Sequence, residues 1–119
     1  MKKADWLKKK CAPCNGNIPI LSGAEVRTHL KGLVGWVLSG DKRSIHTEYL
    51  MKDFSAAIRL IGRIAELADR EGHHPDIHLT CYRKLTIELS THAINGLSEN
   101  DLILAAKIGK LPKKLKILR

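Results

Sequence analysis

The spacing of apolar residues changes at Pro75, and this change constrains the fold of the chain more than any other feature. Through residues 53–72 apolar residues recur at steps of three and four, which predicts one amphipathic helix. Asp53 is placed to cap its start, and Gly72 stands where a helix ends. The stripe expected to be buried consists of Phe54, Ala57, Ile58, Ile61, Ile64, Ala65 and Ala68. After Pro75 apolar and polar residues alternate, which predicts strands instead.

Two segments with this alternation predict β-hairpins. The first covers residues 35–51 and has the turn formers Gly40 and Asp41 at its centre. The second covers residues 76–92 and is expected to turn at residues 82–84. The face of the second hairpin that is expected to be buried carries Ile77, Leu79, Cys81, Leu85, Ile87 and Leu89.

Two shorter helices are predicted outside the hairpins from their start signals. Ser22 followed by Glu25 has the spacing of a capping box, and Ser98 followed by Asp101 repeats it. The resulting order is helix, hairpin, helix, hairpin, helix. Antiparallel hairpins with one apolar face, together with helices that carry one apolar stripe, fit a single sheet covered by helices on one side.

The chain of 119 residues predicts one domain with basic segments at both ends. We expect residues 1–21 to be a basic, irregular lead-in, residues 22–109 to be the domain, and residues 110–119 to be a basic tail. The net charge is +9, yet residues 11–106 carry 10 basic and 11 acidic residues. Basic ends attract phosphate groups or anionic surfaces, or serve only solubility, and both interpretations stay open. Because the charge lies in the ends, no specific nucleic-acid surface is expected.

Hydropathy and cysteine content indicate the compartment. No apolar run approaches the roughly 20 residues that a membrane-spanning helix needs, so a soluble, cytoplasmic protein without membrane contact is expected. Three cysteines are too few for a disulfide framework. Cys11 and Cys14 form a C-x-x-C motif, interpreted as a reduced pair in a loop, with a partial metal site as the alternative.

Histidines cluster where the long helix meets the second hairpin. His73 and His74 precede Pro75, and His92 lies at the end of the paired strand. If the two strands form a hairpin, their outer ends meet, which brings His92 close to the other two. Pro75 favours extended backbone at His74, so the neighbouring side chains are expected to point to opposite sides. Imidazoles titrate near neutrality, and three around one cleft suit acid/base chemistry on a small molecule.

Two other interpretations of these histidines stay open. His74 and His78 are four residues apart and would share one face of a helix, as zinc ligands often do. The alternation after Pro75 favours a strand, however, where the two side chains lie far apart along the chain. The second interpretation treats His73 and His74 as exposed loop residues without a function.

The motifs around these histidines resemble the pterin-4a-carbinolamine dehydratases. The sequence has Asp69 four residues before "HHP", then Tyr82, "STH" at residues 90–92 and "GLSENDLILAAKI" at residues 96–108. The likeness extends back through "KDF" and "GW" and covers about residues 20–108. It implies an α+β fold, a two-layer sandwich of a four-stranded antiparallel sheet with about three helices on one face.

The resemblance also implies an activity, the dehydration of 4a-hydroxytetrahydropterin to quinonoid dihydropterin and water. This reaction recycles the tetrahydropterin that aromatic amino acid hydroxylases use, so a pterin substrate and a hydroxylase of the same pathway are the expected partners. Members of the family assemble as homodimers or homotetramers, and no metal or redox cofactor is expected. The alternative is a non-catalytic oligomeric protein, or a transcriptional coactivator, that binds through its sheet face or basic tails. A metal hydrolase is the third option.

By similarity, the expected site consists of the catalytic residues Asp69, His73, His74 and His92 and the substrate-binding residues Ser90, Thr91 and Asp101. We expect His73 and His92 to flank the pterin as an acid/base pair, and which of the two is the acid stays open. His74 is expected to position the substrate. Asp69 is expected to orient a neighbouring imidazole or raise its pKa.

Simpler interpretations of the remaining residues also stay open. For Asp101 the favoured simpler interpretation is a helix-start residue beside Ser98. On its own simpler interpretation, Asp69 is a solvated residue in the last turn of its helix. Ser90 and Thr91 would be ordinary residues at the end of a strand.

Overall fold

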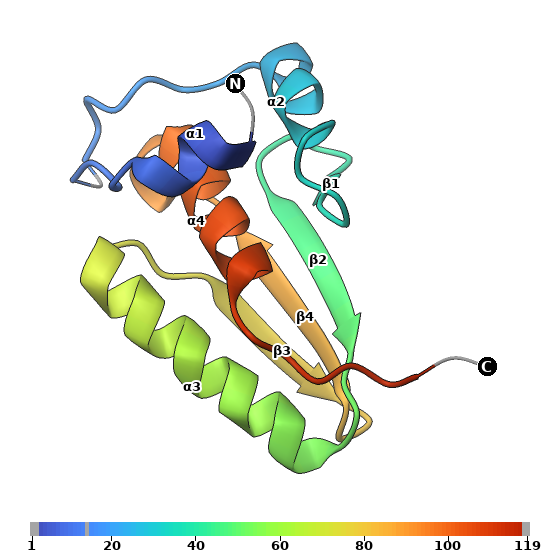
Figure 1. Cartoon of the computed structure of the whole chain (residues 1–119). Coiled ribbons are helices and arrows are strands. Elements are labelled where there is room, and N and C mark those ends of the chain that lie inside the picture. The colour runs from blue at the N-terminus through green and yellow to red at the C-terminus, as the bar shows by residue number, and fades with distance from the viewer. Residues whose placement is uncertain (1–2, 14, 118–119) are drawn as a thin grey trace.

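The structure, a computed structural model, describes residues 3–13 and 15–117, so Cys14 of the C-x-x-C motif lies outside the described residues. The elements along the chain are α1 (Lys3–Lys8), α2 (Gly23–Leu30), β1 (Val37–Leu38), β2 (Ile45–Leu50), α3 (Phe54–Glu71), β3 (Asp76–Thr80), β4 (Lys84–Leu89), the 3-10 helix η1 (His92–Ile94) and α4 (Glu99–Lys110). The predicted order of helices and hairpins is confirmed, and one further helix, α1, precedes it (Figure 1).

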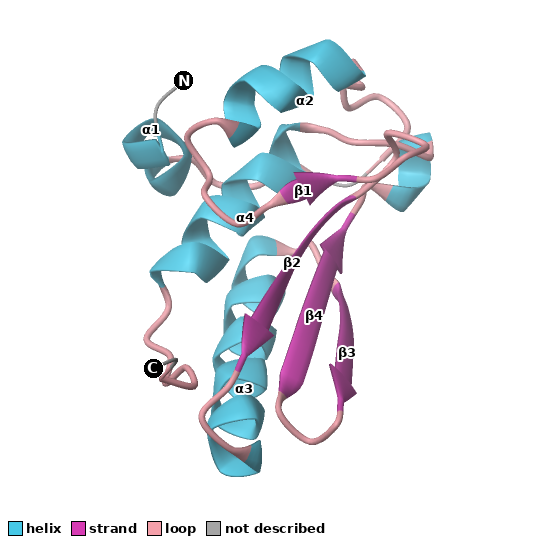
Figure 2. Cartoon of the chain, turned by 90° about the vertical axis from the view of Figure 1, so that its right-hand side faces the viewer, coloured by secondary structure: helices cyan, strands magenta, loops and turns pink. Residues whose placement is uncertain are grey.

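The strands of the described residues form one antiparallel sheet in the order β1-β2-β4-β3. Its centre is the pairing of β2 with β4, which come from different hairpins, and here Thr47 lies opposite Ile87. Helices α3 and α4 lie on the same side of the sheet (Figures 1 and 2). The sheet residues with fully buried side chains are Ile45, Leu85, Ile87 and Leu89. The α+β sandwich implied by the resemblance is therefore confirmed.

Helix α3 has the predicted ends but buries a different stripe. The Ala56 backbone N–H donates to the Asp53 carboxylate at 2.8 Å, and Gly72 ends the helix in the left-handed conformation, with φ of 67°. Phe54 and Ile58, which were expected to be buried, are 53% and 47% exposed. The buried residues are Ala56, Ala57, Leu60, Ile64, Leu67 and Ala68. The helix carries apolar residues on two adjoining faces, and its packing against the sheet and α4 decides which face is covered.

The second hairpin has the predicted buried face except at its turn. Ile77 pairs with Ile87 and Leu79 with Leu85. Strand β3 ends at Thr80, and Cys81, which was expected on the buried face, is exposed. Cys81 and Tyr82 have φ values of 47° and 54°. The register pairs Thr80 with Lys84, so Cys81 lies in the three-residue loop between the strands, and residues with positive φ are common in hairpin loops.

The first residues are not the irregular lead-in that was expected. Residues Lys3–Lys8 form α1, in which Trp6 is almost completely buried. The Trp6 ring meets the His29 ring of α2 edge-on, with ring centroids 5.2 Å apart. A helix of 6 residues shows too little periodicity to be predicted from sequence and is marginal by itself. Burial of one large aromatic side chain therefore accounts for its order.

The basic tail is partly built into the sheet. Lys110 is the last residue of α4, and the chain then runs back along the end of β2. Leu115 forms an isolated β-bridge with Met51, and the Lys116 backbone N–H donates to the Leu50 carbonyl at 2.9 Å. This part of the tail has a defined backbone position. Within residues 3–13 and 15–117, no helix has both the length and the apolar character needed to cross a bilayer.

Candidate functional site

A shallow cavity of about 260 Å³ lies at the end of the sheet where α3 leads into β3 and β4 leads into η1. Its lining residues are Gly72, His73, His74, Ser90, His92 and Ala93. The β3–β4 register pairs Asp76 with Glu88. If this register is continued two residues outward, His74 is set opposite Ser90, and both residues line the cleft. The hairpin thus brings the "HHP" and "STH" segments to one cleft, as their spacing predicted. The cavity is smaller than the ~300–1,000 Å³ typical of drug-sized ligands, so it suits a small molecule.

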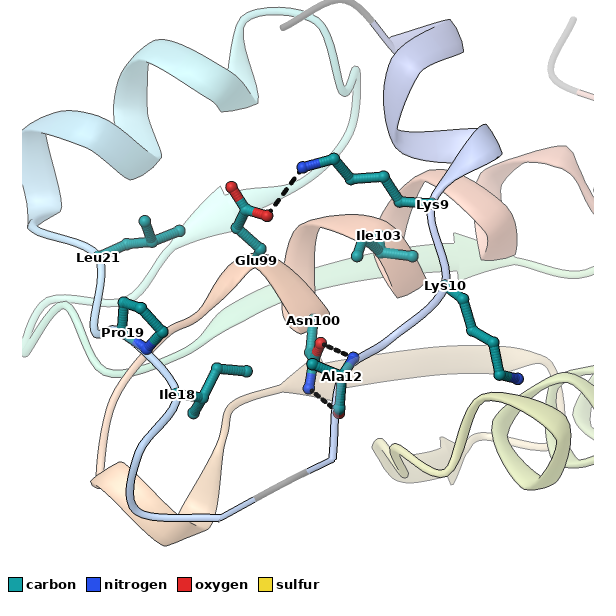
Figure 3. Close-up of a pocket in the computed structure, with 9 residues that line it drawn as sticks. All are labelled: Lys9, Lys10, Ala12, Ile18, Pro19, Leu21, Glu99, Asn100 and Ile103. Atoms are coloured by element: carbon teal, nitrogen blue, oxygen red, sulfur yellow. Dashed lines mark hydrogen bonds and ion pairs between the residues drawn. The ribbon is translucent and has the colours of Figure 1, made fainter.

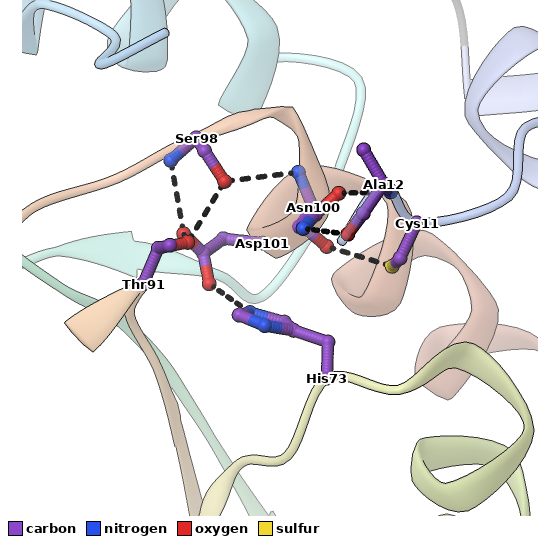
Figure 4. A network of polar contacts seen from close by, with 7 residues as sticks. All are labelled: Cys11, Ala12, His73, Thr91, Ser98, Asn100 and Asp101. Atoms are coloured by element: carbon purple, nitrogen blue, oxygen red, sulfur yellow. Dashed lines mark hydrogen bonds and ion pairs between the residues drawn. The ribbon is translucent and has the colours of Figure 1, made fainter. Parts of the chain in front are cut away.

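His73 is held from behind by a buried carboxylate. Its Nε2 lies 2.6 Å from Asp101 Oδ1, and the two side chains are 4% and 0% exposed. The second carboxylate oxygen of Asp101 accepts hydrogen bonds from the Thr91 hydroxyl at 2.8 Å and the Ser98 backbone N–H at 3.0 Å. The Thr91 and Ser98 hydroxyls lie 2.8 Å apart (Figure 4). This buried network fixes the position of Asp101 and, through it, the orientation of the His73 imidazole.

His74 has a very different setting, although it is the next residue. Its Nε2 lies 3.0 Å from Asp69 Oδ1, and the two side chains are 63% and 77% exposed. Asp69 is in the last turn of α3 and is not among the residues that line the cleft. Exposed pairs of this kind are worth about 0–1 kcal/mol. Asp69 is therefore placed to influence the direction of the His74 ring more than the stability of the fold.

The "STH" segment alternates between the cleft and the interior. Ser90 and His92 line the cleft, whereas Thr91 between them is fully buried. The Thr91 backbone N–H donates to the Gly96 carbonyl at 2.8 Å, and Asn95 closes this loop with φ of 50°. The loop therefore presents Ser90 and His92 on one side and the Thr91 hydroxyl on the other.

Two of the residues expected to contact the substrate, Thr91 and Asp101, do not line this cleft. Thr91 and Asp101 are both fully buried and lie behind His73, where their side chains bond to each other. Asp101 also accepts from the backbone of Ser98 in the predicted capping box, so its helix-start interpretation is confirmed. The spacing of the capping box could be found in the sequence, but the contact with His73 could not. Ser98, which sequence reasoning treated only as a cap, belongs to the same network.

The cleft continues into a second hollow of about 230 Å³ that shares Ser90 and His92. Its further lining residues include Asp41 and Arg43 from the β1–β2 turn and Glu88 from β4. A hydrogen bond from the Ser39 hydroxyl at 2.6 Å is the main cause that holds the pKa of Asp41 below its usual value. Sequence reasoning missed these polar residues because the turn showed only turn formers.

A metal site at the histidines would require several ligand side chains that lie together. Among the described residues, no group of three or more histidine, cysteine, aspartate and glutamate side chains is arranged to hold a metal ion. His78, the proposed zinc partner of His74, is an exposed residue of β3 and is absent from the lining of the cleft.

The chain is similar to known proteins of one family. The family model "Pterin 4 alpha carbinolamine dehydratase" matches residues 19–111. An Arabidopsis thaliana protein named "Pterin-4-alpha-carbinolamine dehydratase 2, mitochondrial" is 40% identical over 111 residues, which are 91% of this chain and 59% of that protein. A relative from Nitrosospira multiformis is 41% identical over 107 residues, 90% of this chain and 92% of the relative.

A solved structure has the same fold. The crystal structure of "transcriptional coactivator/pterin dehydratase" from Brucella melitensis superimposes with a TM-score of 0.72 at 30% identity. It covers 76% of this chain and 96% of the Brucella chain. Almost all of the Brucella chain therefore has a counterpart here, whereas about a quarter of the present chain has none in the Brucella structure.

Proposed function

This chain belongs to the pterin 4 alpha carbinolamine dehydratase family, and we propose that it removes water from a 4a-hydroxytetrahydropterin to give quinonoid dihydropterin. One observation carries the proposal beyond family membership. Imidazoles from two separate segments, His73 and His74 before β3 and His92 after β4, line one small cleft.

The reaction needs two proton transfers. The bond between the ring carbon and the hydroxyl oxygen breaks, and a protonated imidazole supplies the proton with which that oxygen leaves as water. A neutral imidazole takes the proton from the neighbouring ring nitrogen, whose electron pair forms the new double bond. We assign these roles to His73 and His92 as a pair, and positioned groups of this kind contribute about 10²–10⁴-fold each. The reaction leaves the two imidazoles with exchanged protonation states, which solvent restores.

The other expected site residues take supporting roles in this proposal. His74 lies at the exposed rim and positions the substrate, and Asp69 at 3.0 Å orients the His74 ring. Ser90 lines the cleft and offers a hydroxyl to the pterin. Asp101, at 2.6 Å from His73, is a positioning residue and not a substrate contact, and Thr91 holds Asp101.

The test is turnover of authentic 4a-hydroxytetrahydropterin, followed by its absorbance change. We expect His73→Ala and His92→Ala each to lower kcat by about 10²-fold or more. His78→Ala is the matched control, because His78 is an exposed histidine on β3 that does not line the cleft. Equal rates for wild type and all three variants, at the uncatalysed background, would exclude the dehydratase function.

The cellular setting extends the proposal. The enzyme would recycle tetrahydropterin for an aromatic amino acid hydroxylase and act as a homodimer or homotetramer in the cytoplasm. The Arabidopsis relative is named as mitochondrial, so fractionation of cells that produce the protein is the check on compartment. Light scattering at several concentrations measures the oligomeric state.

A second candidate function is binding, because the Brucella structure is described as a transcriptional coactivator as well as a dehydratase. The sheet face opposite α3 and α4 would provide the contact surface (Figure 2). Under this function Glu48→Arg on the exposed part of β2 would reduce complex formation while His92→Ala would not. Loss of turnover in His92→Ala with unchanged turnover in Glu48→Arg favours the dehydratase.

A further inference from the structure

Residues 6–12, here called the strap, precede the residues 19–111 that the family model matches. The strap reaches the end of α3, one residue before the Gly72–His73 segment. The Cys11 backbone N–H donates to Glu71 Oε1 at 2.8 Å, and Lys10 Nζ donates to the Arg70 carbonyl at 2.9 Å. The strap is therefore bonded to the last two residues of the helix that leads into the cleft.

The same few residues also reach the start of α4. The Ala12 backbone N–H donates to Asn100 Oδ1 at 2.8 Å, and Asn100 Nδ2 donates back to the Ala12 carbonyl at 2.9 Å. The Cys11 thiol donates to the Asn100 carbonyl at 3.6 Å (Figure 4). Asn100 is almost completely buried and immediately precedes Asp101. The strap therefore joins the residue before Asp101 to the residues before His73.

An ion pair also joins the end of α3 directly to α4. Glu71 Oε2 lies 2.8 Å from Lys107 Nζ of α4, and the Glu71 side chain is only 9% exposed. Partial burial raises the pKa of Glu71, but hydrogen bonds from Lys107 and the Cys11 backbone outweigh it, so the pKa lies below its usual value. One carboxylate thus bonds the strap with one oxygen and α4 with the other.

The strap and α4 are not packed against each other along their whole length but touch through a few polar contacts. A cavity of about 500 Å³ lies between them, and its apolar walls include Ile18, Pro19, Leu21 and Ile103 (Figure 3). The paired hydrogen bonds of Asn100 and Ala12 cross one side of this cavity, and the ion pair of Lys9 with Glu99 crosses another. The buried Trp6 side chain anchors the start of the strap, and the exposed ion pair contributes little. Where packing is incomplete, the Asn100 and Ala12 hydrogen bonds therefore carry the connection between the end of the strap and α4.

We propose that Asn100 and Glu71 are positioning residues for the dehydratase reaction, which act through the strap to keep His73 at hydrogen-bond distance from Asp101. The proposal rests on the function proposed above. His73 and Asp101 are 28 residues apart in sequence and lie next to two different helix ends. Their separation of 2.6 Å tolerates little relative movement of those ends. A misplacement of about 1 Å at a reacting group costs on the order of 10²-fold in rate, so the strap affects turnover without touching the substrate.

The test compares Asn100→Ala with Glu99→Ala in the full chain. Both substitutions remove a contact between the strap and α4, but only Asn100 bonds Ala12 and precedes Asp101. The direct readout is the imidazole ¹H–¹⁵N signals of His73 and their pH titration, assigned with Asp101→Asn. We expect Asn100→Ala to shift these signals and to lower kcat about tenfold or more at nearly unchanged KM. Glu99→Ala should leave the signals, kcat and KM at wild-type values.

Two further variants keep the proposal testable if Asn100→Ala does not fold. Asn100→Asp keeps the acceptor for the Ala12 N–H but sets a buried carboxylate oxygen against the Ala12 carbonyl, so it should also shift the His73 signals. Glu71→Gln keeps the acceptor for Cys11 and loses the charge next to Lys107. Unchanged His73 signals in every folded variant would overturn the positioning role. The signals do not require turnover, so an inactive wild type with shifted variant signals would overturn only the dehydratase function.

Discussion

His73 and His74 are neighbours in sequence, and each is paired with an aspartate, but the two pairs differ in almost every physical respect. His73 and Asp101 are 2.6 Å apart and almost completely buried. His74 and Asp69 are 3.0 Å apart and are 63% and 77% exposed. Asp101 has further donors from Thr91 and Ser98, and its pair joins segments 28 residues apart, whereas Asp69 is five residues before His74.

This contrast gives a physical basis for the two different roles proposed for His73 and His74. Water screens the exposed pair, so its geometry is adjustable and suits substrate positioning at a rim. The interior does not screen the buried pair, and removal of one partner would leave the other polar group without compensation. His73 is therefore the imidazole with a fixed orientation, as an acid/base group requires.

The largest effect is expected from Asp101→Ala. Breaking a buried pair by removing one partner costs about 3–5 kcal/mol of the free energy of unfolding, because the remaining groups stay buried without partners. Urea unfolding followed by circular dichroism measures this loss, and kcat of the folded protein should fall about 10²-fold. A loss below about 1 kcal/mol would mean that the two aspartate pairs are energetically alike.

The next largest effect is expected from Thr91→Val, which keeps the branched shape and removes the hydroxyl. The Asp101 carboxylate loses one of its donors, and the buried Ser98 hydroxyl loses one of its two partners and keeps the Asn100 backbone N–H. Such losses cost about 1–3 kcal/mol. Thermal unfolding measures the change, and Thr86→Val on β4 is a control because that side chain is only half-buried. Equal melting temperatures for the two variants would contradict a role for Thr91 in the buried network.

The third effect is a pH dependence of stability that comes from Glu71, whose carboxylate bonds Lys107 and the Cys11 backbone. Its pKa in the folded protein is below the ordinary value of 4.5, since the Lys107 and Cys11 hydrogen bonds outweigh the effect of burial. A depressed carboxyl pKa contributes stability that is present above the unfolded pKa and is lost as the pH falls through the folded pKa. As the pH is lowered from 5, the free energy of unfolding should therefore fall more steeply for wild type than for Glu71→Gln. Parallel pH profiles from chemical unfolding would contradict this assignment.

The smallest effect is expected from Asp69→Asn. The exposed pair contributes about 0–1 kcal/mol, so the melting temperature should change little. Turnover should fall less than tenfold, mainly through KM, because His74 is assigned to substrate positioning. In 1 M salt the Debye length is about 3 Å, and the difference in KM between wild type and Asp69→Asn should shrink. A drop in kcat as large as that of Asp101→Ala would remove the distinction between the pairs.

Local patterns in the sequence were sufficient for most of the secondary structure. Asp53 and Gly72 end α3 as predicted, and both capping boxes are present. The meeting of His74 with Ser90 and His92 was also predictable, because a hairpin register follows from alternation and turn position within a few residues. The conformation of the turn could not be predicted in the same way. Cys81 has a positive φ in the turn, and its side chain is exposed instead of lying on the buried face.

Tertiary packing decided what lies beyond the range of such patterns. The partner of His73 depends on how α4 packs against the sheet, so the contact of Asp101 with a residue 28 positions away leaves no periodic trace in the sequence. The buried face of α3, the pairing of β2 with β4 and the order of α1 have the same origin. Caps, turns and alternation act between near neighbours along the chain, whereas these features come from the burial of apolar surface shared by distant segments.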